Sequence, residues 1–264
     1  MHNEVGQFVS LSYRAVYAVW LRYFAVFRKN WFYGLVTTFA EPILFLLSFG
    51  LGLGSLIGTL RVGGVSVGYR PFVLAGIVGQ TVLIQGFFEA SYGGFVRMYY
   101  QRIFQAIAVT PVTLSEVLWG ETAWGASRAT LAASAVLIIG VALGDFSVLG
   151  ALLLVPACFV FSMIFAALGL LVAARSKTIE SISYPQYLLV FPMFLFCGVF
   201  FPLSQLPVMV QKAAWLFPLT PVLSLVRTLV LGFPLEIQAP FLVIFWVALL
   251  VPLSRRFMIG RLLR

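Results

Sequence analysis

Six apolar runs, five of them long enough to cross a hydrocarbon layer, constrain the fold of this chain more than any other feature. They cover residues 34–58, 72–96, 119–143, 148–174 and 182–201, with a shorter sixth run at 237–253. A helix needs about 20 apolar residues to span a bilayer, whereas a membrane β-barrel would show alternating segments of about ten residues. Hydrophobic residues make up 62% of the sequence and charged residues 9%, which a soluble domain of this length cannot accommodate. The sequence therefore predicts an all-α membrane protein with six transmembrane helices.

The positions of the basic residues predict the orientation, because Lys and Arg near helix ends stay preferentially on the cytoplasmic side. With six spans and a cytoplasmic N-terminus, most basic residues fall inside, and both termini are expected in the cytoplasm. The shorter sixth run must then also cross the membrane, because this crossing places four arginines on the cytoplasmic side: Arg255, Arg256, Arg261 and Arg264. The formal charge of +9 is explained by this topology and by attraction to anionic lipid, so nucleic acid is not expected as a partner.

Residues 1–30 lack the order of a cleavable signal peptide and show an amphipathic helical pattern instead. One arc of the helical wheel carries four basic side chains, Arg14, Arg22, Arg28 and Lys29, and the other carries apolar and aromatic ones. We expect a helix that lies in the cytoplasmic interface with its rings at headgroup depth. The alternative is a first spanning helix that starts early, which would bury four cations at about 2.5 kcal/mol or more each.

Groups that could carry chemistry are sparse. The single histidine is His2, and Cys158 and Cys197 both lie in apolar runs, so neither a disulfide nor a metal site is expected. No HExxH helix, Cys/His pair or cluster of carboxylates is available for acid and base catalysis. None of the three lysines follows a glycine, as a phosphate-binding P-loop requires. We therefore expect neither ATP hydrolysis nor a cofactor in this chain.

A polar segment, residues 97–111, separates the second and third runs. Polar side chains recur on one side of it every fourth residue, at Arg97, Gln101 and Gln105. We expect one short amphipathic helix on the cytoplasmic face, ended by Pro111, with Thr113 or Ser115 capping the next helix. These residues alone leave open whether the segment is an ordinary surface helix or a docking element for a partner.

Two patterns inside the runs indicate close packing. Gly50, Gly54 and Gly58 repeat every fourth residue, which allows helix backbones to approach closely, either within one subunit or between two. The fifth run is aromatic and is interrupted by two prolines; its rings include Tyr184, Tyr187, Phe191 and Phe194. Such rings suit sugar rings and acyl chains, but packing or lipid contact explains each ring equally well.

Four charged residues lie within the runs, where an ionisable group normally faces protein or water and pairs there: Glu41, Glu89, Glu121 and Arg128. Glu121 and Arg128 are seven residues apart and share a helical face. We interpret them as structural partners or contacts to a gate region, with substrate binding as the alternative. Glu41 is expected to meet the basic N-terminal helix. On the external side, Lys212 and Arg227 are hypothesised to meet a phosphate or acidic sugar at the mouth of a pathway.

Two motifs, in this order, resemble the membrane subunit of ABC-2 type exporters, and the resemblance covers nearly the whole chain. The first is RMYYQRIFQAIAVTPVT, a polar helix ended by a proline between the second and third spans. The second is CGVFFPLSQLPVMVQKAAWLFPLTPVLSLVRTLVLG, in which a span gives way to short re-entrant helices before the last span. The stretches EPILFLLSFGLGLGSLIG, FFEASYGGFVRM and LWGETAWGASRATLA are most similar to the branch that contains nodulation protein J, a lipooligosaccharide exporter subunit.

The resemblance implies a single ABC-2 domain over residues 1–264, with an interfacial helix at 1–30, a coupling helix at 97–111 and an external re-entrant segment at 202–234. The coupling helix would press on an ATPase subunit through Arg97, Met98, Tyr99, Tyr100, Gln101, Arg102, Phe104 and Gln105. Gln105 departs from the family pattern, because many members carry an acidic residue there. A salt bridge at that position is therefore not expected.

The same resemblance implies the partners. Two copies of the chain would form a homodimer with two ATPase subunits that bind ATP and Mg, in a bacterial inner membrane and in contact with its lipid. The first and fifth spans would line the central path. The cargo would be an amphipathic lipid-linked molecule, a glycolipid or a lipooligosaccharide, with a hydrophobic drug-like or haem-type molecule as the runner-up.

Two other functional classes remain open. A secondary carrier or channel would use the same spans without a motor, and would show ion-gradient dependence and no stable ATPase complex. A membrane-embedded lipid-modifying enzyme would need a reactive constellation that the available residues do not supply.

Overall fold

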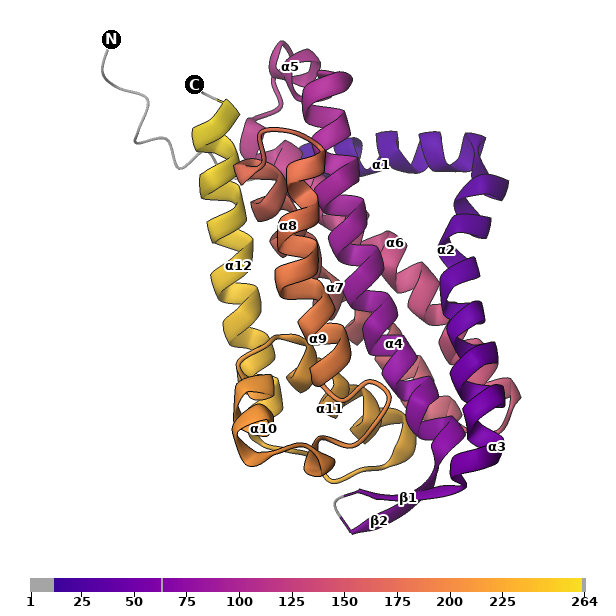
Figure 1. The fold of residues 1–264 in the computed structure, drawn as a ribbon. Coiled ribbons are helices and arrows are strands. Elements are labelled where there is room, and N and C mark those ends of the chain that lie inside the picture. Colours follow the sequence, from indigo (N-terminus) through magenta and orange to yellow (C-terminus); the bar gives the residue numbers. More distant parts are fainter. Residues whose placement is uncertain (1–11, 63, 263–264) are drawn as a thin grey trace.

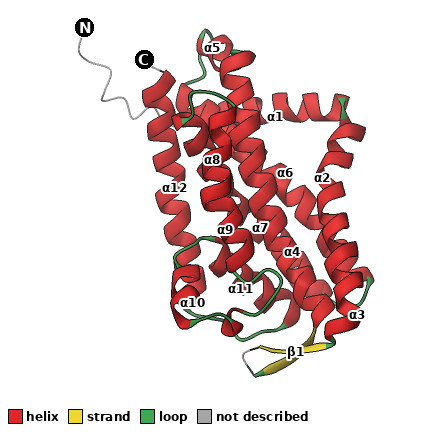
Figure 2. Cartoon of the chain, in the orientation of Figure 1, coloured by secondary structure: helices red, strands yellow, loops and turns green. Residues whose placement is uncertain are grey.

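The computed structural model describes residues 12–262 except residue 63, and this part of the chain is almost entirely helical (Figures 1 and 2). The long helices are α1 (Tyr13–Lys29), α2 (Trp31–Phe45), α4 (Tyr69–Phe88), α6 (Leu114–Ala142), α7 (Val148–Arg175) and α12 (Gln238–Leu262). The short ones are α3 (Gly54–Ile57), α5 (Ile103–Ala108), α8 (Ser183–Pro185), α9 (Phe191–Phe196), α10 (Val208–Trp215) and α11 (Leu219–Leu231). Four π-helical segments extend these helices, at Leu46–Leu53, Glu89–Gly93, Val96–Tyr100 and Gln186–Val190.

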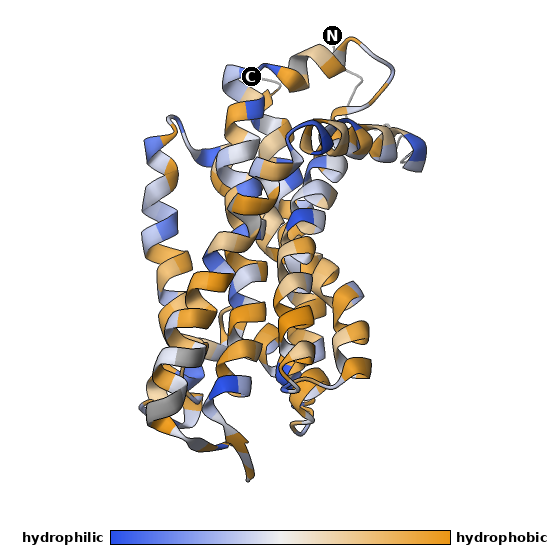
Figure 3. Cartoon of the chain, turned by 90° about the vertical axis from the view of Figure 1, so that its right-hand side faces the viewer, coloured by the Kyte–Doolittle hydropathy of each residue, from blue (hydrophilic) through white to orange (hydrophobic). Residues whose placement is uncertain are grey.

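Within the described residues, five continuous helices are long and apolar enough to cross a membrane: Trp31–Gly50, Tyr69–Tyr100, Leu114–Ala142, Val148–Arg175 and Gln238–Leu262. The pair α10 and α11 adds a sixth only if it is counted as one span, because its two helices meet at 89°. Figure 3 shows apolar residues along most of the length of these helices. The protein is thus an all-α, multi-pass membrane protein, as the sequence predicts.

The predicted fifth span, residues 182–201, is shorter and more irregular than the others. Helical residues run from Glu180 through α8, a π-helical segment and α9, and end at Phe196. Pro185 and Pro192 each lack a backbone N–H, which interrupts the hydrogen-bond ladder and accounts for the change of helix type along this stretch.

Helix α4 is the centre of the molecule. It packs against α6, α7 and α11, and its side chains are buried along most of its length, with Phe72 and Phe87 completely inaccessible. Helix α2 instead stands at the edge of the bundle, where it packs mainly on α6 and less on α4 and α1, and its Phe45 ring contacts Phe194 in α9. One apolar side of α2 therefore has no partner within the described chain, including Ile43, Leu44 and Leu47.

Helix α1 lies across one end of the bundle, where α5 and the last turns of α12 also lie (Figure 1). Its amphipathic pattern is confirmed over Tyr13–Lys29, and residues 1–11 of the predicted interfacial segment lie outside the described residues. Its apolar face packs on α6: Val19 and Tyr23 are buried, and the Trp20 indole N–H donates to Ser127 at 2.9 Å. The Trp20, Tyr23 and Phe27 rings of this face contact Trp124 in α6, whereas the sequence predicts that they lie at the depth of the lipid headgroups.

The opposite end of the molecule holds the β-hairpin and the bent pair of helices (Figure 1). Strand β1 (Thr59–Val62) pairs with β2 (Val65–Gly68) in antiparallel register, with Thr59 opposite Gly68. Gly58 adopts a φ of 68°, which a residue with a side chain rarely adopts, and this turn ends α3 and starts the hairpin. Gly58 is therefore a turn residue and lies outside the continuous helix that the sequence predicts over this repeat.

Candidate functional site

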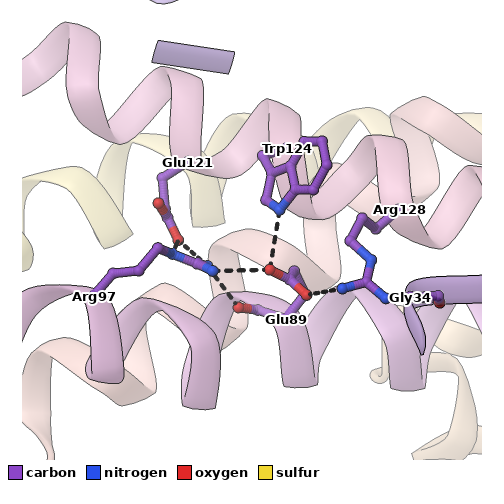
Figure 4. A network of polar contacts seen from close by, with 6 residues as sticks. All are labelled: Gly34, Glu89, Arg97, Glu121, Trp124 and Arg128. Carbon is purple, nitrogen blue, oxygen red and sulfur yellow. Dashed lines mark hydrogen bonds and ion pairs between the residues drawn. The ribbon is translucent and has the colours of Figure 1, made fainter. Parts of the chain in front are cut away.

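Four charged side chains meet between the π-helical extensions of α4 and helix α6, and Figure 4 shows them pointing toward one another. Glu89 and Arg97 come from the π-helical extensions of α4, and Glu121 and Arg128 come from α6. Their exposed side-chain fractions are 14%, 13%, 0% and 19%, respectively. Two cations and two anions make the group neutral, which is the condition under which buried charges are tolerated. We call these four residues the charge network.

Arg97 is the bridging member of the network. Its Nη1 donates to Glu89 Oε1 at 2.9 Å and its Nε donates to Glu121 Oε1 at 2.8 Å. Its Nη2 donates to the Glu89 backbone carbonyl at 3.0 Å and also contacts the Glu121 carboxylate. A planar guanidinium with five donors can serve both carboxylates at once, which a lysine ammonium cannot do with the same geometry.

Glu89 makes two further contacts with α6. Its Oε2 accepts from Arg128 Nη1 at 3.0 Å, and its Oε1 accepts from the Trp124 indole N–H at 3.1 Å. Arg128 Nη2 in turn donates to the backbone carbonyl of Gly34 in α2 at 3.4 Å. The network therefore ties α4 to α6 and reaches α2.

Helix α1 covers the network with aromatic rings. The Arg97 guanidinium lies 5.1 Å from the Tyr23 ring centroid, and the Arg128 guanidinium lies 5.4 Å from that of Phe27. Both rings also contact Trp124. Burial, followed by the negative charge of Glu121, raises the pKa of Tyr23, so this hydroxyl stays protonated under ordinary conditions. Cation–π contacts of this kind join the interfacial helix to the charges beneath it.

The local backbone explains why Glu89 and Arg97 meet. A π-helical turn inserts an extra residue, so the segments Glu89–Gly93 and Val96–Tyr100 change which residues share a face. Gly93 leaves room for the side chain, because a Cβ there would lie 2.9 Å from Arg97 Nη2. A strict 3.6-residue period does not predict this pair. The polar pattern of residues 97–105 instead places Arg97 on one face with Gln101 and Gln105.

The structure corrects the predicted coupling helix. A single helix over 97–110 is wrong: the helix that begins as α4 continues to Tyr100, Arg102 takes a left-handed conformation with φ of 50°, and α5 begins at Ile103. Arg97 points into the bundle because two carboxylates bind it there. The predicted cap is confirmed, since Thr113 accepts from the Glu116 backbone N–H and Glu116 returns the bond in a capping box.

Of the eight residues predicted to contact an ATPase subunit, three are not free for that role. Arg97 belongs to the charge network, and Met98 and Phe104 are buried in the core. Tyr99, Tyr100, Gln101 and Arg102 are exposed. Gln105 lies in the short helix α5, next to the exposed Ala106.

A cavity of about 580 Å³ lies beside the charge network, which we call the network cavity. Its wall includes Arg22 from α1, Asn30 between α1 and α2, Tyr92 and Gln101 from the extension of α4, and Arg128 from α6. The basic face of α1 therefore reaches this cavity through Arg22. Arg14, Arg28 and Lys29 are exposed on the same helix.

A second cavity, of about 400 Å³, lies between α2, α4 and the helical stretch that follows α8; we call it the Glu41 cavity. Glu41, Gln85 and Gln186 bring polar groups to a wall that is otherwise apolar, with Phe191 and Phe194 among its rings. Glu41 thus faces this cavity, and its predicted contact with the basic helix is wrong. The reason is distance: ten residues of helix, about 15 Å, separate it from Trp31 at the start of α2.

A third cavity, of about 630 Å³, continues in the direction of the hairpin; we call it the aromatic cavity. It shares Phe45 and Phe194 with the Glu41 cavity and adds Phe49, Phe200 and Phe201. Phe49 and Phe200 stack with centroids 4.2 Å apart. Tyr184 and Tyr187, also predicted for this face, are exposed on the outer side of the same helical stretch.

The glycine repeat does not form one face. Gly50 lies in the π-helical segment Leu46–Leu53, Gly54 begins α3, and Gly58 lies in the turn after α3 with a φ of 68°. Gly50 is buried beneath Leu46 of its own helix, where a Cβ would lie 2.8 Å from the Leu46 side chain. Gly54 lies near Arg70 at the start of α4. The part of these glycines in pairing two subunits stays a prediction.

The two external cations differ. Lys212 is exposed on α10. Arg227 on α11 is only 8% exposed, donates to the Gly198 and Val199 carbonyls at 2.5 and 3.4 Å, and lies 3.9 Å from the Phe72 ring centroid. The predicted meeting of these two cations with a phosphate or acidic sugar stays a prediction. The sequence does not predict the burial of Arg227, because the carbonyls that bind Arg227 come from a bend inside the fifth apolar run, where a continuous helix is expected.

The comparison with known families follows from this architecture. The model of the ABC-2 type transporter family matches residues 14–231, from the interfacial helix to the end of α11. The chain belongs to the ABC-2 type transporter family. It is 35% identical to nodulation protein J of Rhizobium leguminosarum bv. trifolii over 217 residues, which is 82% of this chain and 81% of that protein.

Other relatives support the same placement. Nodulation protein J of Rhizobium meliloti (strain 1021) is 33% identical over 218 residues, covering 83% of this chain and 82% of the relative. The inner membrane transport permease YadH of Escherichia coli (strain K12) is 26% identical over 241 residues, covering 90% and 92% of the two chains. The protein is therefore an ABC-2 permease subunit of the nodulation protein J branch, and the resemblance read from its motifs is confirmed.

Proposed function

We propose that this ABC-2 permease is the membrane subunit of an ATP-driven exporter and moves an amphipathic molecule out of the cytoplasm. The observation that supports this best is the junction at Arg97, where the exposed connection to α5 and the buried charge network share one short stretch of chain. Force applied at α5 would reach α6 and α2 through the charge network, whose side chains are between 0% and 19% exposed. ATP and Mg would be bound by the ATPase partner, in two copies beside a homodimer of this chain.

In this proposal α5 and residues 99–102 form the contact with the ATPase. The end of the molecule that carries them faces the cytoplasm of a bacterial inner membrane, together with α1 and the C-terminal turns of α12. Basic residues gather at this end, and on α12 Arg261 donates to the Ala173 and Ala174 carbonyls at 2.9 and 2.7 Å. The excess of cations favours this side as the cytoplasmic one.

The three cavities supply a route for the cargo along α2. The network cavity offers arginine and amide groups, the Glu41 cavity offers a carboxylate and two amides, and the aromatic cavity offers rings. Tyr92 links the first two, because it lines the network cavity and its hydroxyl donates to Gln186 at 3.1 Å. Polar groups followed by aromatic ones suit a molecule with a polar head and an apolar tail.

The similarity to nodulation protein J favours a lipid-linked, glycolipid or lipooligosaccharide cargo. A hydrophobic drug-like molecule is the second candidate, and the aromatic cavity is the observation that favours it. Membrane lipid would enclose the outer faces of α7 and α12, where Leu149, Leu152 and Phe241 are exposed.

The test is co-purification of the chain with a co-expressed ATPase subunit, followed by ATP hydrolysis in lipid. Arg102→Glu reverses an exposed charge beside α5, and Arg61→Glu makes the same change on the exposed face of β1. We expect Arg102→Glu to lower the amount of bound ATPase at least fivefold and Arg61→Glu to leave it unchanged. If no ATPase binds the unaltered chain and ion gradients alone move solutes, the protein is a carrier and the proposal is wrong.

A further inference from the structure

A cavity of about 290 Å³ lies at the end of the molecule that carries the hairpin, enclosed by α10, α11 and the loops around them. It corresponds to about ten water volumes, which is room for one sugar ring with a few waters. Apart from Pro202, its wall shares no residue with the three cavities along α2. It is therefore separate from the proposed cargo route. We call it the Arg227 cavity.

Polar side chains from four stretches of chain converge on this cavity: Ser204, Gln211, Ser224 and Glu236, together with Arg227. Gln211 uses its amide nitrogen to bond the Leu206 carbonyl at 2.8 Å, which leaves its amide oxygen as an acceptor. The hydroxyls of Ser204 and Ser224 have no side-chain hydrogen-bond partner among the described residues. Hydrogen-bonding capacity therefore remains unused on several sides of one cavity.

Two opposite charges face this space without forming an ion pair. Arg227 is held by the carbonyls of Gly198 and Val199 and by the Phe72 ring, and these contacts use its Nη2 and one face of the guanidinium. Its Nη1 donates to no partner in the described part of the chain. Glu236 lies across the cavity, close enough for its charge to act on Arg227. The gap between them is open to a ligand.

The chemistry of the wall favours a neutral polyhydroxylated ring. Neighbouring hydroxyls can donate to a carboxylate and accept from a guanidinium edge, while the C–H face of a sugar packs on an aromatic ring such as Trp215, which also lines the cavity. A zwitterionic phosphate headgroup fits less well, because two carbonyls and Phe72 already occupy most of Arg227. Small-molecule sites commonly combine such a ring with a few convergent polar groups.

We propose that the Arg227 cavity binds one pyranose ring of a neutral sugar. The proposal requires neither the ATPase partner nor the cargo route. The ring would come either from free sugar on the far side of the membrane or from the head of a lipid-linked molecule. These sources share the same ring chemistry and differ in the presence of a tail.

Ligand-observed NMR on the full chain in lipid nanodiscs tests the proposal. The probes are methyl β-glucoside and methyl β-N-acetylglucosaminide for free sugar, and the corresponding dodecyl glycosides for tailed sugar. Glu236→Gln removes the carboxylate charge at the cavity, and Glu180→Gln makes the same change at an exposed site near the other end. Ser224→Phe fills the cavity.

We expect saturation transfer to the ring protons of at least one probe, weakened tenfold or more in Glu236→Gln and Ser224→Phe and unchanged in Glu180→Gln. Binding of methyl glycosides assigns the site to free sugar, and binding of dodecyl glycosides alone assigns it to tailed sugar.

Equal transfer in all variants would mean surface binding, and no transfer would mean a cavity filled by water; either result overturns the proposal. Competition by phosphoethanolamine but not by sugar would also overturn it. Size-exclusion profiles identify variants that fail to fold. If Ser224→Phe fails to fold, Glu236→Gln still tests the proposal, because Glu236 is at an exposed position.

Because this test uses the permease alone, it is separable from the exporter proposal. Sugar binding without any ATPase complex would leave the Arg227 site standing and remove the exporter proposal. An ATP-driven complex whose permease binds no sugar would do the opposite.

Discussion

At the scale of single residues, Arg97 is the position that holds the charge network together. It joins two carboxylates on different helices and lies beneath the Tyr23 ring. Buried charges of this kind add little stability compared with a well-packed apolar core, but removal of one member leaves the others unpaired. Arg97 is therefore sensitive to substitution even if it never touches a partner protein.

We predict that Arg97→Ala lowers the free energy of unfolding by about 3–5 kcal/mol, because Glu121 and Glu89 lose their shared partner in a buried site. Thermal unfolding in nanodiscs measures the effect. Arg102→Ala is the matched control, since its side chain is exposed and its removal should change stability by no more than about 0.5 kcal/mol. Equal effects of the two substitutions would show that Arg97 is not buried in a charge network.

At the scale of elements, the docking of α1 on α6 depends on a close approach. A Cβ at Gly120 would lie 2.6 Å from the Val19 side chain and 3.2 Å from the Val16 carbonyl. The start of α1 is also tied to α6, because the Ser12 backbone N–H donates to Glu116 at 2.8 Å. The position of α1, and with it the cover over the charge network, is therefore set by residues of α6.

We predict that Gly120→Val displaces α1 from α6, because there is no room for the new side chain at that contact. Hydrogen exchange of the α1 amides should become at least tenfold faster. Gly260→Val is the control, since apart from the neighbouring backbone of α12 no atom lies within 4 Å of a Cβ placed there, and the substitution should leave α1 unaffected. Unchanged exchange in Gly120→Val would contradict the described packing.

The sequence predicts these elements with uneven success, for physical reasons. Hydropathy reveals the apolar helices and the amphipathic face of α1, and short-range side-chain chemistry reveals the Thr113–Glu116 cap. The pairing of Glu89 with Arg97 could not be predicted, because π-helical turns alter the helical period in a way that composition does not signal. The burial of Arg227 was also beyond reach, since its partners are backbone carbonyls. The pattern of side chains in a sequence does not indicate which backbone carbonyls a buried side chain will contact.

At the scale of the whole molecule, the uncovered side of α2 is the feature that needs a partner. Ile43, Leu44 and Leu47 are exposed on it, and the Glu41 and aromatic cavities lie beside it. In the proposed homodimer this side faces the second copy, so that two sets of cavities would enclose one path.

We predict that Leu44→Cys forms a disulfide between two copies under mild oxidation in membranes, because the homodimer would bring the two α2 helices together. Leu152→Cys on the exposed side of α7 is the control and should not cross-link. The native Cys158 and Cys197 are buried, which keeps the background low. A Leu44→Cys chain that stays monomeric while Leu152→Cys cross-links would place the interface elsewhere.

The central claim is that movement at α5 reaches α2 through the charge network. The most direct measurement is the distance between spin labels at Leu44→Cys in the two copies, by pulsed electron paramagnetic resonance, with the ATPase partner present. The account predicts a change of distance on addition of ATP that is lost in Arg97→Lys, which keeps the charge but cannot bridge both carboxylates with the same geometry. A distance that is the same with and without ATP, or a change that persists in Arg97→Lys, would contradict it.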